Sequence, residues 1–282
     1  MSHASTLRKA LAAGHCLKAP GVYDGLSALL VEQAGFELGF VSGACIAFAA
    51  YGRPDLGLIG MTEVADTVAR LRERVELPLS VDIDTGFGNA LNVQRTVRVM
   101  ERAGASAMQI EDQVMPKRCG HMAGKQVIPA NEMVGKLHAA LDARADADIV
   151  IIARTDALSV TGFDDALDRA ECYLEAGADA LFIEAPKTLE QMQQIAGRFA
   201  ARVPLVHNLV EGGHSPVGDA PGLEALGYRM ALYPAALLHC FVPRAQALLR
   251  HITLAGETAS FAGLIDLPKI NEVLGVDDLL ES

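Results

Sequence analysis

The chain has 282 residues, of which 51% are hydrophobic and 21% are charged, and its formal net charge is −11. This composition excludes a disordered chain, because it can bury a large core, and the lack of any basic run argues against a nucleic-acid partner. The longest apolar stretches are about strand length, well short of the roughly 20 residues that a membrane span requires, so we expect no membrane partner either.

Eight short apolar runs recur along the chain, each rich in Val, Ile or Leu and without the alternation of a half-exposed strand. Runs of this kind are typical of strands that are buried on both faces of a parallel sheet. The expected strands lie within residues 16–24, 38–43, 77–84, 107–112, 148–156, 180–185, 204–212 and 229–234.

Segments with apolar residues at helical spacing separate these runs, at residues 24–34, 62–73, 92–103, 131–143, 164–176 and 188–199. Three of them end in Ala-Gly, at Gly35, Gly104 and Gly177, and such a glycine supplies the left-handed residue that closes a helix. The alternation predicts an α/β fold, a (β/α)8 TIM-type barrel. An open doubly wound sheet is disfavoured, because no Gly-x-Gly-x-x-Gly turn follows the first strand.

No low-complexity linker divides the chain, so we expect one catalytic domain over residues 1–282, with a short helical tail from about 260 to 282. Residues 1–13 lack the apolar segment of a signal peptide. The five cysteines are an odd number without paired spacing, which argues against disulfides or a zinc ribbon and favours the cytoplasm. We interpret four of them as small core residues, namely Cys16, Cys45, Cys172 and Cys240.

Polar side chains follow nearly every predicted strand, at the end where barrels build their active sites. A lone acid there is usually a helix cap or a surface residue, and we interpret Asp24, Asp112 and Asp156 individually in this way. Several acids on one rim would repel one another unless a cation compensates them. The polar residues at or just after strand ends are Tyr23, Asp24, Ser42, Asp55, Asp82, Asp84, Glu111, Asp112, Arg154, Asp156, Glu184, His207, Asn208 and Glu211.

A candidate metal site stands out among these residues. Asp82 and Asp84 are two residues apart, which places both carboxylates on one face of a strand. Glu111 would join them from the next strand, and Asp55 from a preceding loop. An all-oxygen set favours Mg²⁺, with Mn²⁺ as a possible substitute, and Mg²⁺ keeps several waters. The alternative is a hydrogen-bonded polar core without metal.

The loop at residues 116–121 brings positive charge beside these acids. Lys117, Arg118 or His121 would lower the pKa of the Cys119 thiol and make it a better proton carrier. Gly120 permits close approach of the backbone to a ligand. By itself such a loop is more often a solvated turn, but its place after the strand that carries Glu111 favours function.

Seven motifs together resemble the isocitrate lyase and phosphoenolpyruvate mutase superfamily, over roughly residues 20–234. They are SGACIAF, PDLG, VDIDTGFG, IEDQVMPKRCGH, IIARTDA, FIEAP and HNLVEGGHSP. The KRCGH signature is typical of the lyase branch, whose short members are the 2-methylisocitrate lyases, the 2,3-dimethylmalate lyases and the oxaloacetate hydrolases.

The resemblance implies Mg²⁺ at Asp82, Asp84 and Glu111, and Cys119 on a loop that closes over the ligand. It also implies a homotetramer, built as a dimer of dimers, in which the eighth helix is exchanged between subunits. The 2-keto-acid half of a small dicarboxylate or 2-keto-acid substrate would be bound by Ser42, Gly43, Ala44 and Arg154, and its other carboxylate by Gly120, His121 and Asn208.

The chemistry that follows is retro-aldol cleavage of a 2-hydroxy or hydrated 2-keto dicarboxylate. Cys119 would protonate the carbanion, with Lys117 and His121 stabilising charge around it. The base stays open between Tyr23, Glu184 and a water at the metal.

Three alternatives remain for this site. The first is a mutase or hydrolase acting at a phosphonate P–C bond, in which Cys119 has no obvious task. The second is simple decarboxylation of oxaloacetate. The third, from a different class, is a non-catalytic 2-keto-acid-binding protein, which would be expected to have lost one of the strand-end acids.

Overall fold

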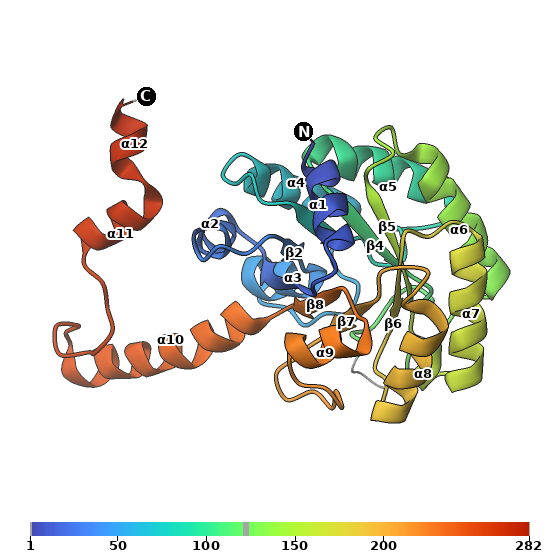
Figure 1. Cartoon of the computed structure of the whole chain (residues 1–282). Coiled ribbons are helices and arrows are strands. Elements are labelled where there is room, and N and C mark those ends of the chain that lie inside the picture. The colour runs from blue at the N-terminus through green and yellow to red at the C-terminus, as the bar shows by residue number, and fades with distance from the viewer. Residues whose placement is uncertain (1, 121–123, 282) are drawn as a thin grey trace. The chain divides into compact units, whose positions relative to one another are not determined.

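Eight parallel strands form one sheet in the order β6-β5-β4-β3-β2-β1-β8-β7, in a computed structural model that describes residues 2–120 and 124–281. A parallel bridge between Leu181 and Leu205 joins the two ends of that order, so the barrel is nearly closed. The predicted (β/α)8 class is therefore confirmed (Figure 1). The strands are β1 (Leu17–Val22), β2 (Gly39–Val41), β3 (Leu79–Asp82), β4 (Ala107–Glu111), β5 (Val150–Thr155), β6 (Ala180–Ile183), β7 (Val206–Asn208) and β8 (Met230–Tyr233).

Each predicted apolar run contains one of these strands, but the strand is shorter than the run. In β7 three residues pair, although the run covers 204–212. The remaining residues of a run belong to the loop that enters or leaves the barrel. Side chains from successive strands fill the interior at alternate positions, as Val150 and Ile152 do on β5 and Ala180 and Phe182 on β6.

The six predicted helices are all present, and local chemistry explains where they begin. Asp24 caps α2 (Gly25–Gln33) by accepting from the Ser27 amide at 2.7 Å, and the Ser27 hydroxyl oxygen accepts from the Asp24 amide. Gly104 closes α5 (Ala90–Ala103) with φ +104°. The other expected helices of the barrel unit are α4 (Met61–Arg72), α6 (Ala130–Ala143), α7 (Phe163–Glu175) and α8 (Leu189–Phe199). A further helix, α1 (His3–Ala12), precedes the first strand.

Between the strands of the barrel, two described helices and a short 3-10 turn lie outside the predicted segments. The sequence of α3 (Gly43–Tyr51) is apolar on nearly all sides, so it has no helical periodicity to detect. The second, α9 (Ala220–Leu226), is only seven residues long and contains Pro and Gly. The 3-10 turn η1 (Ala157–Ser159) follows β5. Both α3 and η1 directly follow strand ends, and this position places them beside the polar residues of the rim.

The chain divides into two compact units, residues 1–236 and 237–282, and the second is entirely helical in its regular elements. It comprises nearly all of α10 (Ala236–Ala255), together with α11 (Leu267–Leu274) and α12 (Val276–Glu281). Large apolar side chains are exposed along α10, with Leu254 at 85%. The Arg244 guanidinium lies 5.5 Å over the Phe261 ring within this unit.

The cysteines are only partly as expected. Cys16 and Cys45 are buried, as predicted for core residues, but Cys172 and Cys240 are exposed, so the core interpretation is wrong for these two. Cys172 lies on α7, which turns a different stripe, including Ala170 and Tyr173, toward the barrel. In the described part of the chain, no helix has both the length and the apolar character needed to cross a bilayer.

Candidate active site

In each strand every second side chain points into the barrel, and the polar residues of the rim continue this inward-pointing series. On β5 the inward series Val150 and Ile152 continues to Arg154, and on β6 the series of Ala180 and Phe182 continues to Glu184. The same phase gives Glu111 on β4 and Asn208 on β7. Because the inward side chains of parallel strands converge at the carboxyl end, one pleat pattern delivers all four polar groups to the same rim.

An acid cluster, defined as Asp55, Asp82, Asp84 and Glu111, occupies the side of this rim formed by β2 to β4. All four are buried. The Lys117 ammonium enters the cluster, with its Nζ 2.6 Å from Asp55 Oδ1 and 2.9 Å from Asp84 Oδ1. Lys117 thus lies among the acids, where it contacts Asp55 and Asp84.

Asp82 and Asp84 do meet, but not for the predicted reason. Strand β3 ends at Asp82, and Asp84 lies beyond it with a positive φ of 48°. The Asp84 amide donates to Asp82 Oδ1 at 3.1 Å, so a tight turn, and not strand alternation, brings the two side chains together. A non-glycine residue in the left-handed region is sparsely populated and is found at functional sites more than elsewhere.

The acid cluster carries more negative charge than its surroundings compensate. Burial raises the pKa of Asp82, raises that of Asp84 to about 7, and raises that of Glu111 well above its usual value. Burial alone would lower the pKa of Lys117, but Asp84 and the other acids outweigh it and raise that pKa. Glu111 Oε1 has no hydrogen-bond donor among the residues that the structure describes.

These features fit a cation bound through water better than a closed cage of side chains. Over the described ranges, no three His, Cys, Asp or Glu side chains converge closely enough to ligate one ion together. Mg²⁺ characteristically takes one or two carboxylates and keeps several waters. Such an ion suits a site whose donors are all oxygen atoms and in which Glu111 Oε1 accepts no hydrogen bond from a described residue.

The N-terminus of α3 adjoins the acid cluster. Ser42 is buried and caps the helix, its hydroxyl accepting from the Cys45 amide at 3.3 Å. A methyl group built on Gly43 would lie 3.7 Å from both Asp82 Oδ2 and Asp84 Oδ1. The first backbone amides of α3, at Gly43 and Ala44, therefore lie where a ligand held by these acids would meet them.

Arg154 links the acid cluster to the opposite side of the rim. Its Nε is 3.3 Å from Glu111 Oε2, and its Nη2 is 3.7 Å from Glu184 Oε2. Asp156 holds the same guanidinium at 2.9 Å. Burial opposes the charge, but Asp156, Glu184 and Glu111 raise the pKa of Arg154, so it remains a cation.

The loop after β4 lies over Arg154 and Glu184. A Cβ built on Gly120 would fall 2.5 Å from Arg154 Nη2 and 2.8 Å from Glu184 Oε1, so a larger residue here would have to displace these two side chains. Cys119 precedes it and is half-buried. The Gln113 side chain fixes the start of the loop, donating to the Arg118 carbonyl at 2.9 Å and accepting from the Arg118 amide at 3.0 Å. His121, also predicted for the site, lies outside the described residues.

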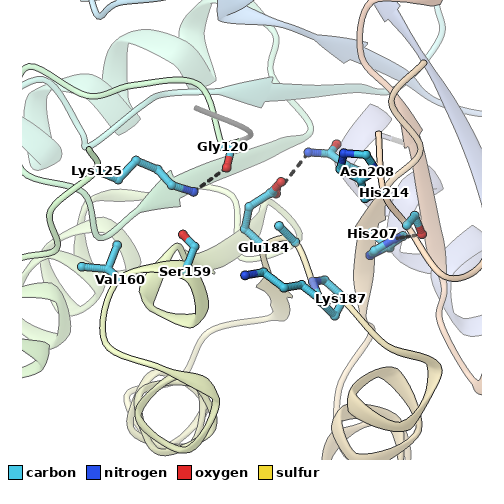
Figure 2. A pocket seen from close by; sticks show the side chains of 12 residues that line it. Gly120, Lys125, Ser159, Val160, Glu184, Lys187, His207, Asn208 and His214 are labelled. Carbon is cyan, nitrogen blue, oxygen red and sulfur yellow. Dashed lines mark hydrogen bonds between the residues drawn. The ribbon is translucent and has the colours of Figure 1, made fainter. Parts of the chain in front are cut away.

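A cavity of about 520 Å³ opens beside Gly120, on the side of β5 to β7 (Figure 2). The Asn208 amide donates to Glu184 Oε2 at 3.2 Å within it. The His207 side chain also lines the cavity, and its Nε2 lies 2.7 Å from Ser215 Oγ, which itself donates to a backbone carbonyl. The cavity is lined by Gly120, Lys125, Ser159, Val160, Glu184, Ala185, Pro186, Lys187, His207, Asn208, His214 and Ser215.

Tyr23 is half-buried at the end of β1, and burial raises its pKa to about 12. Of the three acids interpreted as caps or surface residues, Asp24 is indeed an exposed helix cap. For the other two that interpretation is wrong. Asp112 is buried and accepts from Thr155 and Tyr173 at 2.7 and 2.8 Å, and Asp156 is fully buried against Arg154.

Sequence reasoning missed Lys125, which lines the cavity and contacts Asp156 at 2.7 Å. It follows Gly120 by only five residues, so the loop motif itself was the available signal. Lys187 and Ser159 also line the cavity, and nothing in their sequence context distinguishes them from ordinary loop residues.

Comparison with known proteins is consistent with this geometry. The 2,3-dimethylmalate lyase of Eubacterium barkeri is 38% identical over 285 residues, covering 100% of this chain and 97% of that protein. A 2-methylisocitrate lyase of Aeropyrum pernix is 44% identical over 250 residues, covering 89% of this chain and 80% of that protein.

Solved structures show the same likeness. Oxaloacetate acetylhydrolase with the inhibitor 3,3-difluorooxalacetate superposes with a TM-score of 0.94 at 32% identity, covering 99% of this chain and 95% of that one. A crystal form of 2,3-dimethylmalate lyase gives 0.93 at 33% identity, covering 100% and 94%. Phosphonopyruvate hydrolase in complex with oxalate and Mg²⁺ gives 0.89 at 33% identity, covering 100% and 98%.

The family described as phosphoenolpyruvate phosphomutase matches residues 7–253 of this chain, which is most of its length. The matched 2,3-dimethylmalate lyase structure is itself described as a member of the phosphoenolpyruvate mutase and isocitrate lyase superfamily. The chain therefore belongs to the phosphoenolpyruvate phosphomutase family, within that superfamily, as the resemblance of its motifs led us to expect.

Proposed function

We propose that this protein is a metal-dependent carbon–carbon lyase that cleaves a small 2-hydroxy or hydrated 2-keto dicarboxylate. The expected lyase class is confirmed by the 2,3-dimethylmalate lyase and 2-methylisocitrate lyases among its relatives. One observation carries the proposal for the site itself. Gly120 packs against Arg154 and Glu184, so the Cys119 loop and the acid cluster face the same small space.

The proposed cofactor is Mg²⁺, with Mn²⁺ as a substitute, held at Asp82, Asp84 and Glu111 directly or through waters. Two observations support this cofactor: Glu111 Oε1 accepts no hydrogen bond from a described residue, and the pKa values of the three acids are raised. When bound, such an ion supplies Lewis-acid stabilisation of negative charge on the 2-oxygen of the substrate. Lys117 and Asp55 would then hold the neighbouring acids in place through their 2.6 Å contact.

The protein's own groups supply the remaining charge stabilisation. Arg154 would bind the keto-acid half from the far side of the acid cluster, and the amides at Gly43 and Ala44 from the near side, beside Ser42. Well-placed donors of this kind are worth roughly 3–4 kcal/mol each in the transition state. Gly120, Asn208 and, beyond the described residues, His121 would bind the second carboxylate.

Two groups would move protons. The Cys119 Sγ–H would protonate the carbon that leaves when the C–C bond breaks, assisted by Lys117 and His121. For the base that removes the hydroxyl proton we favour Glu184, which is buried beside Arg154 and accepts from Asn208. Tyr23 is the weaker choice, because with a pKa of about 12 its phenol is protonated at neutral pH.

We further propose that the 282 residues act as one catalytic domain in a cytoplasmic homotetramer, a dimer of dimers in which α10 is exchanged between subunits. The exposed apolar side chains of α10, including Phe241 at 61% and Leu249 at 63%, support this part of the proposal. Light scattering at micromolar concentration tests it, and a monomer would contradict it.

The test of function offers the protein with Mg²⁺ four compounds separately: 2-methylisocitrate, 2,3-dimethylmalate, oxaloacetate and phosphonopyruvate. We expect cleavage of one of the first three, and loss of all turnover in EDTA. Cys119→Ala should lower kcat by about 10²–10⁴-fold, the contribution of a positioned proton donor. Full activity of that variant would refute the role of Cys119.

Turnover of phosphonopyruvate alone would instead favour the phosphonate alternative, which the likeness to phosphonopyruvate hydrolase keeps open. Loss of CO₂ from oxaloacetate without formation of acetate would favour the decarboxylase. Binding of these acids without turnover of any would favour the non-catalytic binding protein.

A further inference from the structure

Lys125 is the centre of a buried polar contact that the proposed mechanism does not use. Its ammonium donates to the Gly120 carbonyl at 2.5 Å and lies 2.7 Å from Asp156 Oδ1 (Figure 2 shows the first contact). The Lys125 side chain is 3% exposed and that of Asp156 is fully buried. A lysine is almost never buried this deeply without a partner, so both contacts are part of the fold.

Asp156 holds a second cation at the same time. The Arg154 Nε lies 2.9 Å from Asp156 Oδ2, and its Nη2 lies 3.2 Å from Oδ1. A continuous series of polar contacts therefore runs from the Gly120 carbonyl through Lys125 and Asp156 to Arg154. We call these four residues and their contacts the latch.

The latch fixes Gly120 from one side while packing fixes it from the other. The space where a Cβ would stand on Gly120 is filled by the Arg154 and Glu184 side chains. Its carbonyl is held by Lys125. Gly120, the residue that follows Cys119, is thus held at both its α-carbon and its carbonyl, and this restricts where the Cys119 thiol can lie.

We propose that Lys125 is a positioning residue. Its ammonium bridges the Gly120 carbonyl and the Asp156 carboxylate, and in this way it keeps Cys119 aligned with Arg154. This rests on the proposed function insofar as Cys119 is the proton donor. The competing explanation is that Lys125 only neutralises Asp156. In that case the position of its ammonium would not matter, and removing both charges together would restore the site.

The first measurement does not depend on turnover. Metal-loaded protein is treated with iodoacetamide, and the rate at Cys119 is followed by peptide mass spectrometry, with exposed Cys172 as the internal reference. We expect Lys125→Met to raise the Cys119 rate about tenfold, the effect of losing one charge-assisted hydrogen bond. The Cys172 rate should not change. An unchanged Cys119 rate would overturn the proposal even if no substrate had been found.

Lys136→Met is the matched control. Lys136 is also buried and donates to a backbone carbonyl, that of Thr85, at 3.0 Å. It therefore reproduces the loss of a buried ammonium without touching the latch. We expect it to leave the alkylation rate of Cys119 at the wild-type value, and an equal rise in both variants would mean that general loosening, and not the latch, exposes Cys119.

Kinetics then separate position from charge. With an active substrate, Lys125→Met should lower kcat about 100-fold with little change in KM, as expected when a reacting group is displaced by about 1 Å. The double variant Lys125→Met with Asp156→Asn should not recover kcat. Recovery would show that neutralisation is the whole role of Lys125.

A charge-conserving variant covers the case in which Lys125→Met does not fold. Lys125→Arg keeps a cation beside Asp156, but its planar head cannot take the same position as an ammonium. We expect the kcat and the Cys119 alkylation rate of Lys125→Arg to lie between those of the wild type and those of Lys125→Met. Wild-type values for both would overturn the proposal.

Discussion

The two sides of the barrel rim treat buried acids in opposite ways. In the acid cluster, burial raises the pKa values of Asp82, Asp84 and Glu111, and the cation inserted among them is Lys117. In the latch, burial also opposes the charge of Asp156, but Arg154 and Lys125 outweigh it and lower its pKa. The acid cluster therefore has fewer positive than negative charges, whereas in the latch the charge of Asp156 is compensated by two cations.

The difference separates a binding site from a scaffold. Buried carboxylates that lack compensation are costly unless a cation arrives, so the acid cluster is built to be completed by a ligand. The latch is complete without one. Arg154 belongs to both, because it contacts Glu111 at 3.3 Å and Asp156 at 2.9 Å, and it therefore connects the two sides.

The largest effect is expected in the latch. Asp156→Asn leaves Lys125 and Arg154 without their shared carboxylate, and breaking a buried pair in this way costs about 3–5 kcal/mol of the free energy of unfolding. Urea unfolding at pH 7 measures it. An effect below 1 kcal/mol would show that the latch does not stabilise the fold.

The same variant gives a pH dependence with a defined sign. Because the pKa of Asp156 is lowered by folding, its contribution is present above the unfolded value of about 3.9 and is lost as pH falls through the folded value. The difference between wild type and Asp156→Asn should therefore stay constant from pH 7 to about pH 5 and shrink below about pH 4.

An opposite result is expected in the acid cluster. Asp82→Asn removes a carboxylate whose pKa is raised by burial, so the protein in EDTA should unfold at a higher urea concentration than wild type. Mg²⁺ affinity, measured by calorimetry, should fall about 10–100-fold. Asp24→Asn, at an exposed helix cap, is the control for losing one negative charge. Destabilisation by Asp82→Asn without Mg²⁺ would contradict the contrast between the two sides.

The smallest loss of stability is expected near Asp112, a buried acid that is stabilised in a third way. Asp112 accepts from Thr155, Tyr173, Arg169 and the Asp156 amide, so several donors share its charge. Tyr173→Phe removes one of them and should cost about 1 kcal/mol. A loss as large as that of Asp156→Asn would mean that Asp112 depends on a single donor, unlike the arrangement seen here.

Neighbouring residues show how far sequence reasoning reached. Glu111 and Asp112 are adjacent acids at the end of β4, and the sequence analysis assigned Glu111 to the metal site but interpreted Asp112 as a cap or surface residue. In the fold they point to opposite faces, Glu111 toward Arg154 and Asp112 toward Tyr173 on α7. Alternation in a strand requires this divergence, but which face is the interior depends on how the sheet closes.

The sequence by itself determined the barrel, its eight strands and the rim on which the polar residues meet, because buried strands and capped helices leave local patterns in composition and spacing. Tertiary structure alone decided the chemistry within that rim. It turned Asp84 inward through a tight turn, inserted Lys117 among the acids and joined Lys125 to Asp156 across 31 residues of sequence. Charges buried side by side are set by contacts between distant segments, and no local pattern records those contacts.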